Sequence, residues 1–344
     1  MMELSSFSLT VNLCIFVSGT FAIWFAGTLL STYADEIARR TGLGHVFVGL
    51  FLLAGVTSLP EIATSFSAAQ QGESQLAVTN LLGSIAMQVA ILAVGDLLYS
   101  RRALTYIVPD PALMLQGTLN IVLLNLVAIA MVFGDVGFWG AGVWTWGLFL
   151  AVLYSFFKLQ EASNRQPWVA NFSGNSGQEK ETVVSNALKP IKGLPAKAVM
   201  CSLVILVAGF FVARTATSIA SQTGISSSFM GMAFLAISTS LPELSTVFAA
   251  LCQKLYAMAI SDIFGTNILN VGLIFGIDII AKQSPVLNHL GSFSVVAALL
   301  GALLTGLFLM GLAERRDRTF LRMGMDSLLV LLFYGAGLAL LFNL

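Results

Sequence analysis

The amino-acid sequence predicts an all-α membrane protein of ten transmembrane helices, arranged as two inverted five-helix repeats. Three observations lead to this prediction. The chain has 344 residues, of which 57% are apolar and only 10% are charged, whereas a soluble domain carries about 25% charged residues. Ten stretches are long and apolar enough to cross a bilayer. One motif of five residues occurs twice, once in each half of the chain.

The expected spans are windows of roughly 20 apolar residues. In chain order they cover residues 11–34, 44–70, 76–98, 112–134, 137–158, 197–220, 227–253, 256–280, 290–313 and 325–343. The polar interval 160–196 is rich in Ser, Asn, Gly, Gln and Lys, and we expect it to be a linker. It separates a first repeat, residues 1–159, from a second, residues 197–344. Because each repeat has an odd number of spans, the second enters the membrane in the opposite sense.

The two halves share an internal sequence repeat. Residues 57–61 read Thr-Ser-Leu-Pro-Glu, and residues 239–243 read the same five letters. When residues 41–96 are laid on 223–278 without a gap, 19 of 56 positions are identical. Shared apolar composition would give scattered matches, but not an unbroken run that contains hydroxyl, proline and acidic residues.

Basic residues between the spans predict the orientation. If the N-terminus lies outside, 15 Lys and Arg residues fall on the inner side and only Arg214 and Lys282 on the outer side. Cytoplasmic loops are the ones that carry an excess of basic residues. We therefore expect both termini outside and the linker in the cytoplasm.

The repeated motif places a proline and a carboxylate inside an apolar span, where both are costly. Pro60 cannot donate a backbone hydrogen bond, so we expect carbonyls near residues 54–57 to lack a helical partner. A bound cation could satisfy them. With the hydroxyls of Thr57 and Ser58 and the carboxylate of Glu61, they would form the oxygen ligand set that Ca2+ and Na+ prefer. The second half offers the matching residues Ala236, Thr239, Ser240 and Glu243.

The alternative interpretation is that Pro60 and Pro242 only kink their helices and that each glutamate is hydrogen-bonded within the bundle. The occurrence of the same arrangement in both halves favours the ion site, because transporters bind ions at broken helices in repeated halves.

The following span of each half adds a second polar pair. Ser84 is followed four residues later by Gln88, and Thr266 by Asn270. Residues four apart share a helix face, so both pairs can point at the break. Hydrogen bonding between helices is the alternative role for Gln88 and Asn270.

Other polar residues are expected to have structural roles. Asn80 and Asp262 lie one turn before the pairs just described, and we expect them at solvated helix ends rather than on an access path for ions. Cys14, Cys201 and Cys252 lie in apolar segments without the spacing of a metal site.

The doubled motif, followed in each half by a helix with Gly-Ser or Gly-Thr, resembles the alpha repeats of the prokaryotic type of Ca2+:cation antiporter, the family that includes the sodium/calcium exchangers. The resemblance covers essentially the whole chain. It implies a bundle in a prokaryotic inner membrane whose second, third, seventh and eighth helices surround the ion sites while the first and sixth slide across them. The implied ligands are the carbonyls of Ala54, Thr57, Ala236 and Thr239 and the side chains of Ser58, Glu61, Ser84, Gln88, Ser240, Glu243, Thr266 and Asn270. Of these residues, we expect Glu61, Glu243, Thr57 and Thr239 to contact the metal ion.

Two departures from the family pattern bear on selectivity. Val56 and Ser238 stand where the family usually has glycine. Gln88 and Asn270 stand where microbial sodium/calcium exchangers have Asn and Asp, so we expect two carboxylates at the site rather than three. Two carboxylates neutralise one Ca2+, two Na+ or two protons, and a third Na+ would leave a costly net charge. The count favours electroneutral or proton-coupled exchange.

The sequence therefore predicts a secondary active antiporter, not an enzyme, that moves Ca2+ against Na+ or H+ by alternating access and needs no cofactor. Its expected partners are inorganic cations and the lipid bilayer, with the oligomeric state left open. The net charge of +0 gives no indication of nucleic-acid binding. A cation channel and a transport-inactive relative are the alternatives. A membrane-embedded enzyme is disfavoured, because the sequence has no nucleophile–base motif.

Overall fold

A computed structural model describes residues 7–41, 54–99, 102–108, 110–165, 193–281, 285–320 and 322–344. The first half contains α1 (Leu9–Thr41), α3 (Ala54–Thr57), α4 (Leu59–Gln71), α5 (Ser74–Tyr99), α6 (Leu104–Ile107), α7 (Pro111–Phe133) and α8 (Val143–Arg165). The second half contains α9 (Leu194–Thr223), α10 (Ser227–Phe229), the π-helix η3 (Met230–Leu235), α11 (Ala236–Thr239), α12 (Leu241–Cys252), α13 (Tyr256–Ile280), the 3-10 helix η4 (Val286–His289), α14 (Ser292–Glu314) and α15 (Met325–Phe342).

The described elements repeat between the halves at the same spacing as the five-residue motif. α3, α4 and α5 correspond in this way to α11, α12 and α13, whose first residues all keep that spacing. The strands β1 (Gly137–Phe138) and β2 (Ala141–Gly142) pair antiparallel, and β3 (Thr319–Phe320) and β4 (Met323–Gly324) form the equivalent hairpin in the second half. The two halves therefore fold alike over these elements.

The hairpins correct the expectation of an all-α chain. The span predicted at 137–158 begins with β1 and β2, and its helix starts only at Val143. The hairpin forms because Trp139 and Gly140 both adopt a positive φ, of 48° and 81°, which suits a tight two-residue turn. Strands of two residues are too short to show an alternating pattern, so the sequence did not reveal them.

The predicted linker is shorter than expected at both ends. α8 continues to Arg165, and α9 begins at Leu194. The remainder of the linker, residues 166–192, lies outside the described residues, as do residues 44–53 of the second predicted span.

Seven described helices are long and apolar enough to cross a membrane: α1, α5, α7, α9, α13, α14 and α15. The segments Ser227–Thr239 and Leu241–Cys252 together qualify as an eighth span, bent by 46° at the break between them. The structure is thus that of a largely helical membrane protein with seven or eight candidate spans among its described residues.

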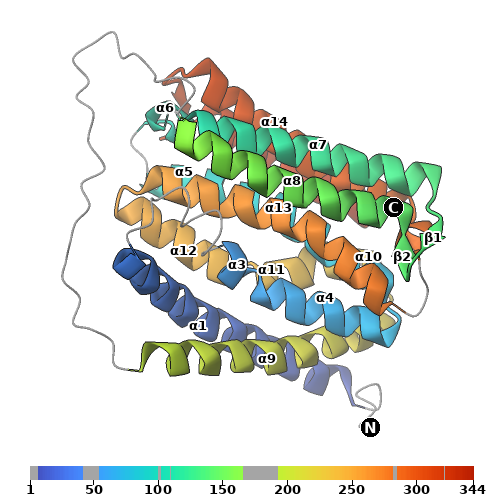
Figure 1. The fold of residues 1–344 in the computed structure, drawn as a ribbon. Helices are drawn as coiled ribbons and strands as arrows, with labels where there is room; N and C mark the ends of the chain where they lie inside the picture. The colour runs from blue at the N-terminus through green and yellow to red at the C-terminus, as the bar shows by residue number, and fades with distance from the viewer. Residues whose placement is uncertain are drawn as a thin grey trace, which may run out of the picture.

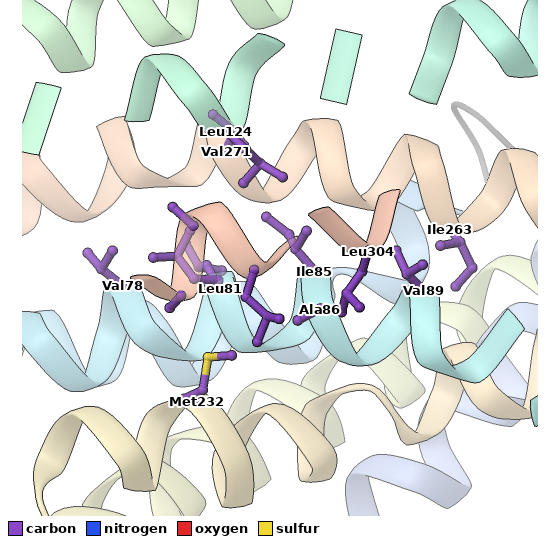
Figure 2. Close-up of a cluster of buried hydrophobic side chains, with 14 of the residues drawn as sticks. Val78, Leu81, Ile85, Ala86, Val89, Leu124, Met232, Ile263, Val271 and Leu304 are labelled. Carbon is purple, nitrogen blue, oxygen red and sulfur yellow. The ribbon is translucent and has the colours of Figure 1, made fainter. Parts of the chain in front are cut away.

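The helices form three layers (Figure 1). α6, α7, α8 and α14 lie on one side, α1 and α9 on the other, and the broken helices lie between them with α5 and α13. Apolar side chains join the middle layer to the first, as Figure 2 shows around α5. The labelled side chains are Val78, Leu81, Ile85, Ala86 and Val89 of α5, Leu124 of α7, Met232 of η3, Ile263 and Val271 of α13, and Leu304 of α14.

α1 and α9 run antiparallel as a pair. Asn12, near the start of α1, donates a hydrogen bond to Gln222, near the end of α9, at 3.4 Å. Each helix packs on the broken helix of the other half through a glycine. A Cβ atom at Gly27 of α1 would meet the ring of Pro242, and one at Gly209 of α9 would lie 2.6 Å from the Cβ of Ala63. The pair therefore lies directly over the two breaks.

Two buried aspartates connect the halves. Asp96, near the end of α5, accepts a hydrogen bond from the backbone N–H of Gly324 at 2.8 Å. Asp278, at the equivalent position of α13, accepts one from the N–H of Gly142 at 2.7 Å. Each aspartate also accepts the N–H of the residue eight positions further on. Each half thus holds the hairpin of the other half by a charged hydrogen bond.

Candidate functional site

The breaks in the two helices follow from the repeated proline. α3 ends at Thr57 and α4 begins at Leu59, with Pro60 in its first turn. In the second half, α11 ends at Thr239 and α12 begins at Leu241. Proline is tolerated in the first turn of a helix, where its missing N–H has no intrahelical partner in any case. The chain therefore ends one helix and starts another at each motif, and in the second half the two helices qualify together as one bent span.

The expectation that the carbonyls before the break have no helical partner is wrong for Ala54. Its oxygen accepts the N–H of Ser58 at 3.1 Å and the hydroxyl of Ser58 at 2.6 Å. The equivalent oxygen of Ala236 accepts the N–H of Ser240 at 3.0 Å. The reason is that a proline removes the donor to the carbonyl four residues before it, which is residue 56 or 238 and not residue 54 or 236.

Glu61 and Glu243 lie in the first turns of α4 and α12 and are fully buried. Their carboxylates interact electrostatically with one another. None of the four carboxylate oxygens makes a hydrogen bond of standard geometry within the protein. A buried carboxylate without such partners is costly, so this pair is a place where cations or protons would be held.

Hydroxyl groups approach the glutamates crosswise between the halves. Thr239 and Ser240 of the second half face the carboxylate of Glu61, together with Ser84 of α5. Thr57 of the first half faces Glu243. The hydroxyls of Ser84 and Thr239 are 3.3 Å apart. The two breaks therefore form one site rather than two separate ones.

The remaining predicted ligands are buried as well. All twelve are at most 1% exposed, so none of them faces lipid or water. The side-chain polar atoms of Gln88 and Asn270 and the hydroxyls of Ser240 and Thr266 have no hydrogen-bond partner. Their oxygens are neutral ligands of the kind that accompany carboxylates around hard cations.

Asn80 and Asp262 are not at solvated helix ends, and that expectation is wrong. Both are at most 1% exposed. The amide of Asn80 donates to the hydroxyls of Thr64 at 3.1 Å and Ser65 at 2.9 Å, and Asp262 accepts the hydroxyl of Thr246 at 3.0 Å. The cause is that α4 packs along α5, and α12 along α13, beyond the break.

Asp262 also changes the charge of the site. Its carboxylate interacts electrostatically with Glu243, so three buried carboxylates lie in this region rather than the two expected. The identical residues Thr64 and Thr246 each precede the polar residue by 16 positions. That shared spacing was the sequence signal that could have revealed the contact. Asn267, whose side chain is fully buried without a hydrogen-bond partner, was also missed.

No group of three or more His, Cys, Asp and Glu side chains within the described ranges is arranged to hold one metal ion. A cation at this site would need hydroxyl, amide or carbonyl oxygens beside the carboxylates. Ca2+ and Na+ accept such mixed oxygen ligands, whereas zinc and other transition metals favour nitrogen and sulfur.

Comparison with known proteins identifies the family. The chain matches the sodium/calcium exchanger protein family over residues 11–159 and again over residues 195–343. It is 28% identical over 274 residues to the inner membrane protein YrbG of Escherichia coli, covering 74% of this chain and 78% of the relative. It is 26% identical over 293 residues to the sodium/calcium exchanger MaX1 of Methanosarcina acetivorans, covering 78% and 83%.

The fold also has a counterpart among solved structures. The chain resembles the sodium-calcium exchanger NCX_Mj, soaked with Na+ and Sr2+, with a TM-score of 0.57 and 20% identity. The match covers 96% of this chain and 99% of that chain. Since the family match spans most of the sequence, the chain belongs to the sodium/calcium exchanger family and is a cation antiporter of the membrane.

Proposed function

We propose that the protein exchanges Ca2+ for Na+ or H+ by alternating access, with Glu61 and Glu243 as the central ligands. The observation that carries this proposal is the pair of fully buried glutamates, without hydrogen bonds of standard geometry, at two facing helix breaks. A cation or a proton would offset the cost of burying each charge. Because Ca2+ and the monovalent ions need the same two carboxylates, they compete for the site, as exchange requires.

The proposed coordination of the ions uses the buried oxygens around this pair. Thr57 and Thr239 would contact the metal ion beside the two glutamates. The other proposed ligands are Ala54, Ser58, Ser84, Gln88, Ala236, Ser240, Thr266 and Asn270. The transported ions are cargo, and no cofactor enters the proposal.

Alternating access would come from α1 and α9. Their glycines allow the two helices to approach Pro242 and Ala63 closely at the breaks. Both helices lie together on one outer side of the bundle, next to the broken helices (Figure 1). This position supports their role as the elements that uncover the site on one side and then on the other.

We infer that the complete architecture is ten spans in two inverted repeats, residues 1–159 and 197–344, joined by the linker 160–196. The element bounds that recur in both halves at the spacing of the motif support this inference, as does the twofold family match. The first span of each repeat would be α1 or α9, and these two helices run antiparallel, as inversion requires.

The basic residues predict the orientation in the membrane. We expect a tag placed within residues 166–192 to be cytoplasmic and a tag at either terminus to be outside, in the inner membrane of a prokaryotic cell, because 15 of 17 basic residues then lie inside. Protease digestion of right-side-out and inside-out vesicles measures this. Cleavage of the linker tag from the outer side would reverse the assignment.

Flux measurements on the purified full chain test the function. Vesicles would be loaded with radioactive Ca2+, and a Na+ gradient and a pH gradient would be imposed separately at clamped membrane potential. We expect at least one gradient to drive Ca2+ uphill. A channel would instead let Ca2+ run down without a counter-ion, and a transport-inactive relative would match empty vesicles. Either of these results would refute the proposed exchange.

A further inference from the structure

We propose that Asp262 and Thr246 form a separate subsite for Na+, one step away from the glutamate pair. The proposal rests on the exchange function proposed above and adds a residue to the ion path that neither the motif nor the family pattern indicates. It depends on the contacts of Asp262, on their difference from those of Asn80 in the other half, and on the charge of the whole region.

The two halves differ at this position by one atom, an amide nitrogen in the first half and a carboxylate oxygen in the second. Asn80 and Asp262 occupy equivalent positions of the internal repeat. The amide of Asn80 is satisfied, since its nitrogen donates to Thr64 and Ser65 and its oxygen accepts from Thr239 at 3.5 Å. Asp262 has no amide to donate. Its Oδ1 atom is buried without a hydrogen-bond partner, so this position has an unpaired acceptor where the first half has a closed network.

Thr246 can turn its hydroxyl to make room for a cation. Its oxygen lies 3.0 Å from Oδ2 of Asp262 and 2.9 Å from the carbonyl oxygen of Glu243. A hydroxyl has one proton and two lone pairs. When the proton is donated to the carbonyl of Glu243, the hydroxyl oxygen and the adjacent Oδ2 of Asp262 both act as acceptors, beside the unpaired Oδ1 of the same carboxylate. Hydroxyl and carboxylate oxygens are ligands that a hard cation prefers.

The charge of the region favours a monovalent ion. Glu61, Glu243 and Asp262 are all buried, and none of the ion pairs among the described residues involves them. One Ca2+ or two Na+ at the glutamates would leave the charge of Asp262 uncompensated, which is costly in a low-dielectric interior. A single carboxylate matches the charge of one Na+.

The subsite is displaced along α13 from Asn270, the ligand predicted for the second half. Asp262 and Asn270 lie eight residues apart on α13, which corresponds to about 12 Å along the helix axis. The chain has a neutral amide at residue 270 and a carboxylate about two turns earlier. A Na+ ion at Asp262 would lie beyond the glutamate pair rather than between its members, so it could be present together with ions at that pair.

The test compares two fluxes through the same protein in vesicles: Na+-driven Ca2+ efflux and Ca2+–Ca2+ self-exchange. For Asp262→Asn we expect the ratio of the first to the second to fall at least about tenfold, because one Na+ ligand and its charge are lost. The Hill coefficient for Na+ should fall by about one. Asp110→Asn, which removes a carboxylate at the helix start of α7, is the matched control and should leave both fluxes as they are.

Equal loss of both fluxes in Asp262→Asn, or loss of neither, would overturn the subsite. If this variant does not fold, Thr246→Val decides in the same way, since it removes the hydroxyl and keeps the charge. Equilibrium binding of radioactive Na+ to the purified full chain separates the two proposals. If the unmodified protein exchanges no Ca2+, the proposed function fails. In that case the subsite is supported only if Asp262→Asn binds about one Na+ fewer per chain than the unmodified protein does.

Discussion

Glu61→Gln and Glu243→Gln are each expected to reduce cation exchange by at least about 100-fold, a loss of roughly 2.7 kcal/mol in ion binding. Each substitution keeps the shape of the side chain and removes one of the charges that face the site. The folded protein should persist or become more stable, because an amide avoids the cost of an unpaired buried carboxylate. Exchange in vesicles and the melting temperature in detergent measure the two effects.

Glu73→Gln is the matched control for the glutamate variants. Glu73 lies between α4 and α5, is partly exposed, and its substitution should leave exchange and melting unchanged. Coupled flux at the normal rate in Glu61→Gln or Glu243→Gln would remove that carboxylate from the mechanism. A sharp fall in melting temperature would show instead that the pair is structural.

Gly83→Val and Gly231→Val should each prevent the protein from assembling. A Cβ atom at Gly83 of α5 would lie 2.7 Å from the Cα atom of Met232 in η3. One at Gly231 would lie 2.6 Å from the carbonyl oxygen of Leu76. The nearest atoms at Gly83 all belong to the backbone of Met232, and Gly231 meets the backbone of Leu76 as well as the hydroxyl of Thr79. Backbone atoms cannot turn aside. Overpacking of this kind costs typically 1–3 kcal/mol, and we expect about 3 kcal/mol or more here.

Size-exclusion profiles and melting temperatures in detergent measure the effect of the glycine variants. The control is Gly147→Val on α8, where an added Cβ meets nothing within 4 Å, and it should give a normal profile. Normal assembly of Gly83→Val would mean that α5 and η3 do not approach as closely as the structure has them.

The sequence predicted the helical membrane class from its long apolar spans, and the family from residues that are costly inside such a span. Pro60 and Glu61 disrupt an apolar span, and the repetition of this costly arrangement in both halves favoured an antiporter. The family match confirms that identification. The depth of Asp262 could not be predicted in the same way. Helical periodicity places a residue on a face, but how far a neighbouring helix covers that face depends on packing between helices.

The error at Asp262 affected the expected coupling. Counting carboxylates from the motif alone gave two charges and favoured electroneutral exchange. The structure places a third buried carboxylate beside Glu243. The ligand identities and the ten-span layout stay predictions, because they depend on ions and on residues outside the described ranges.

The aspartates that connect the halves have a consequence for the synthesis of the chain. The hydrogen bond of Gly142 can form only after Asp278, 136 residues later, has been synthesised. The hydrogen bond of Asp96 with Gly324 can form only after a further 228 residues. At about 5–20 residues per second on the ribosome, these intervals last on the order of 10 s. During that time the N–H of Gly142 lacks its carboxylate acceptor, and Asp96 accepts the N–H of Leu104 but not yet that of Gly324. The first half therefore inserts into the bilayer without its contacts to the second half, and these contacts form only when the last spans have been synthesised.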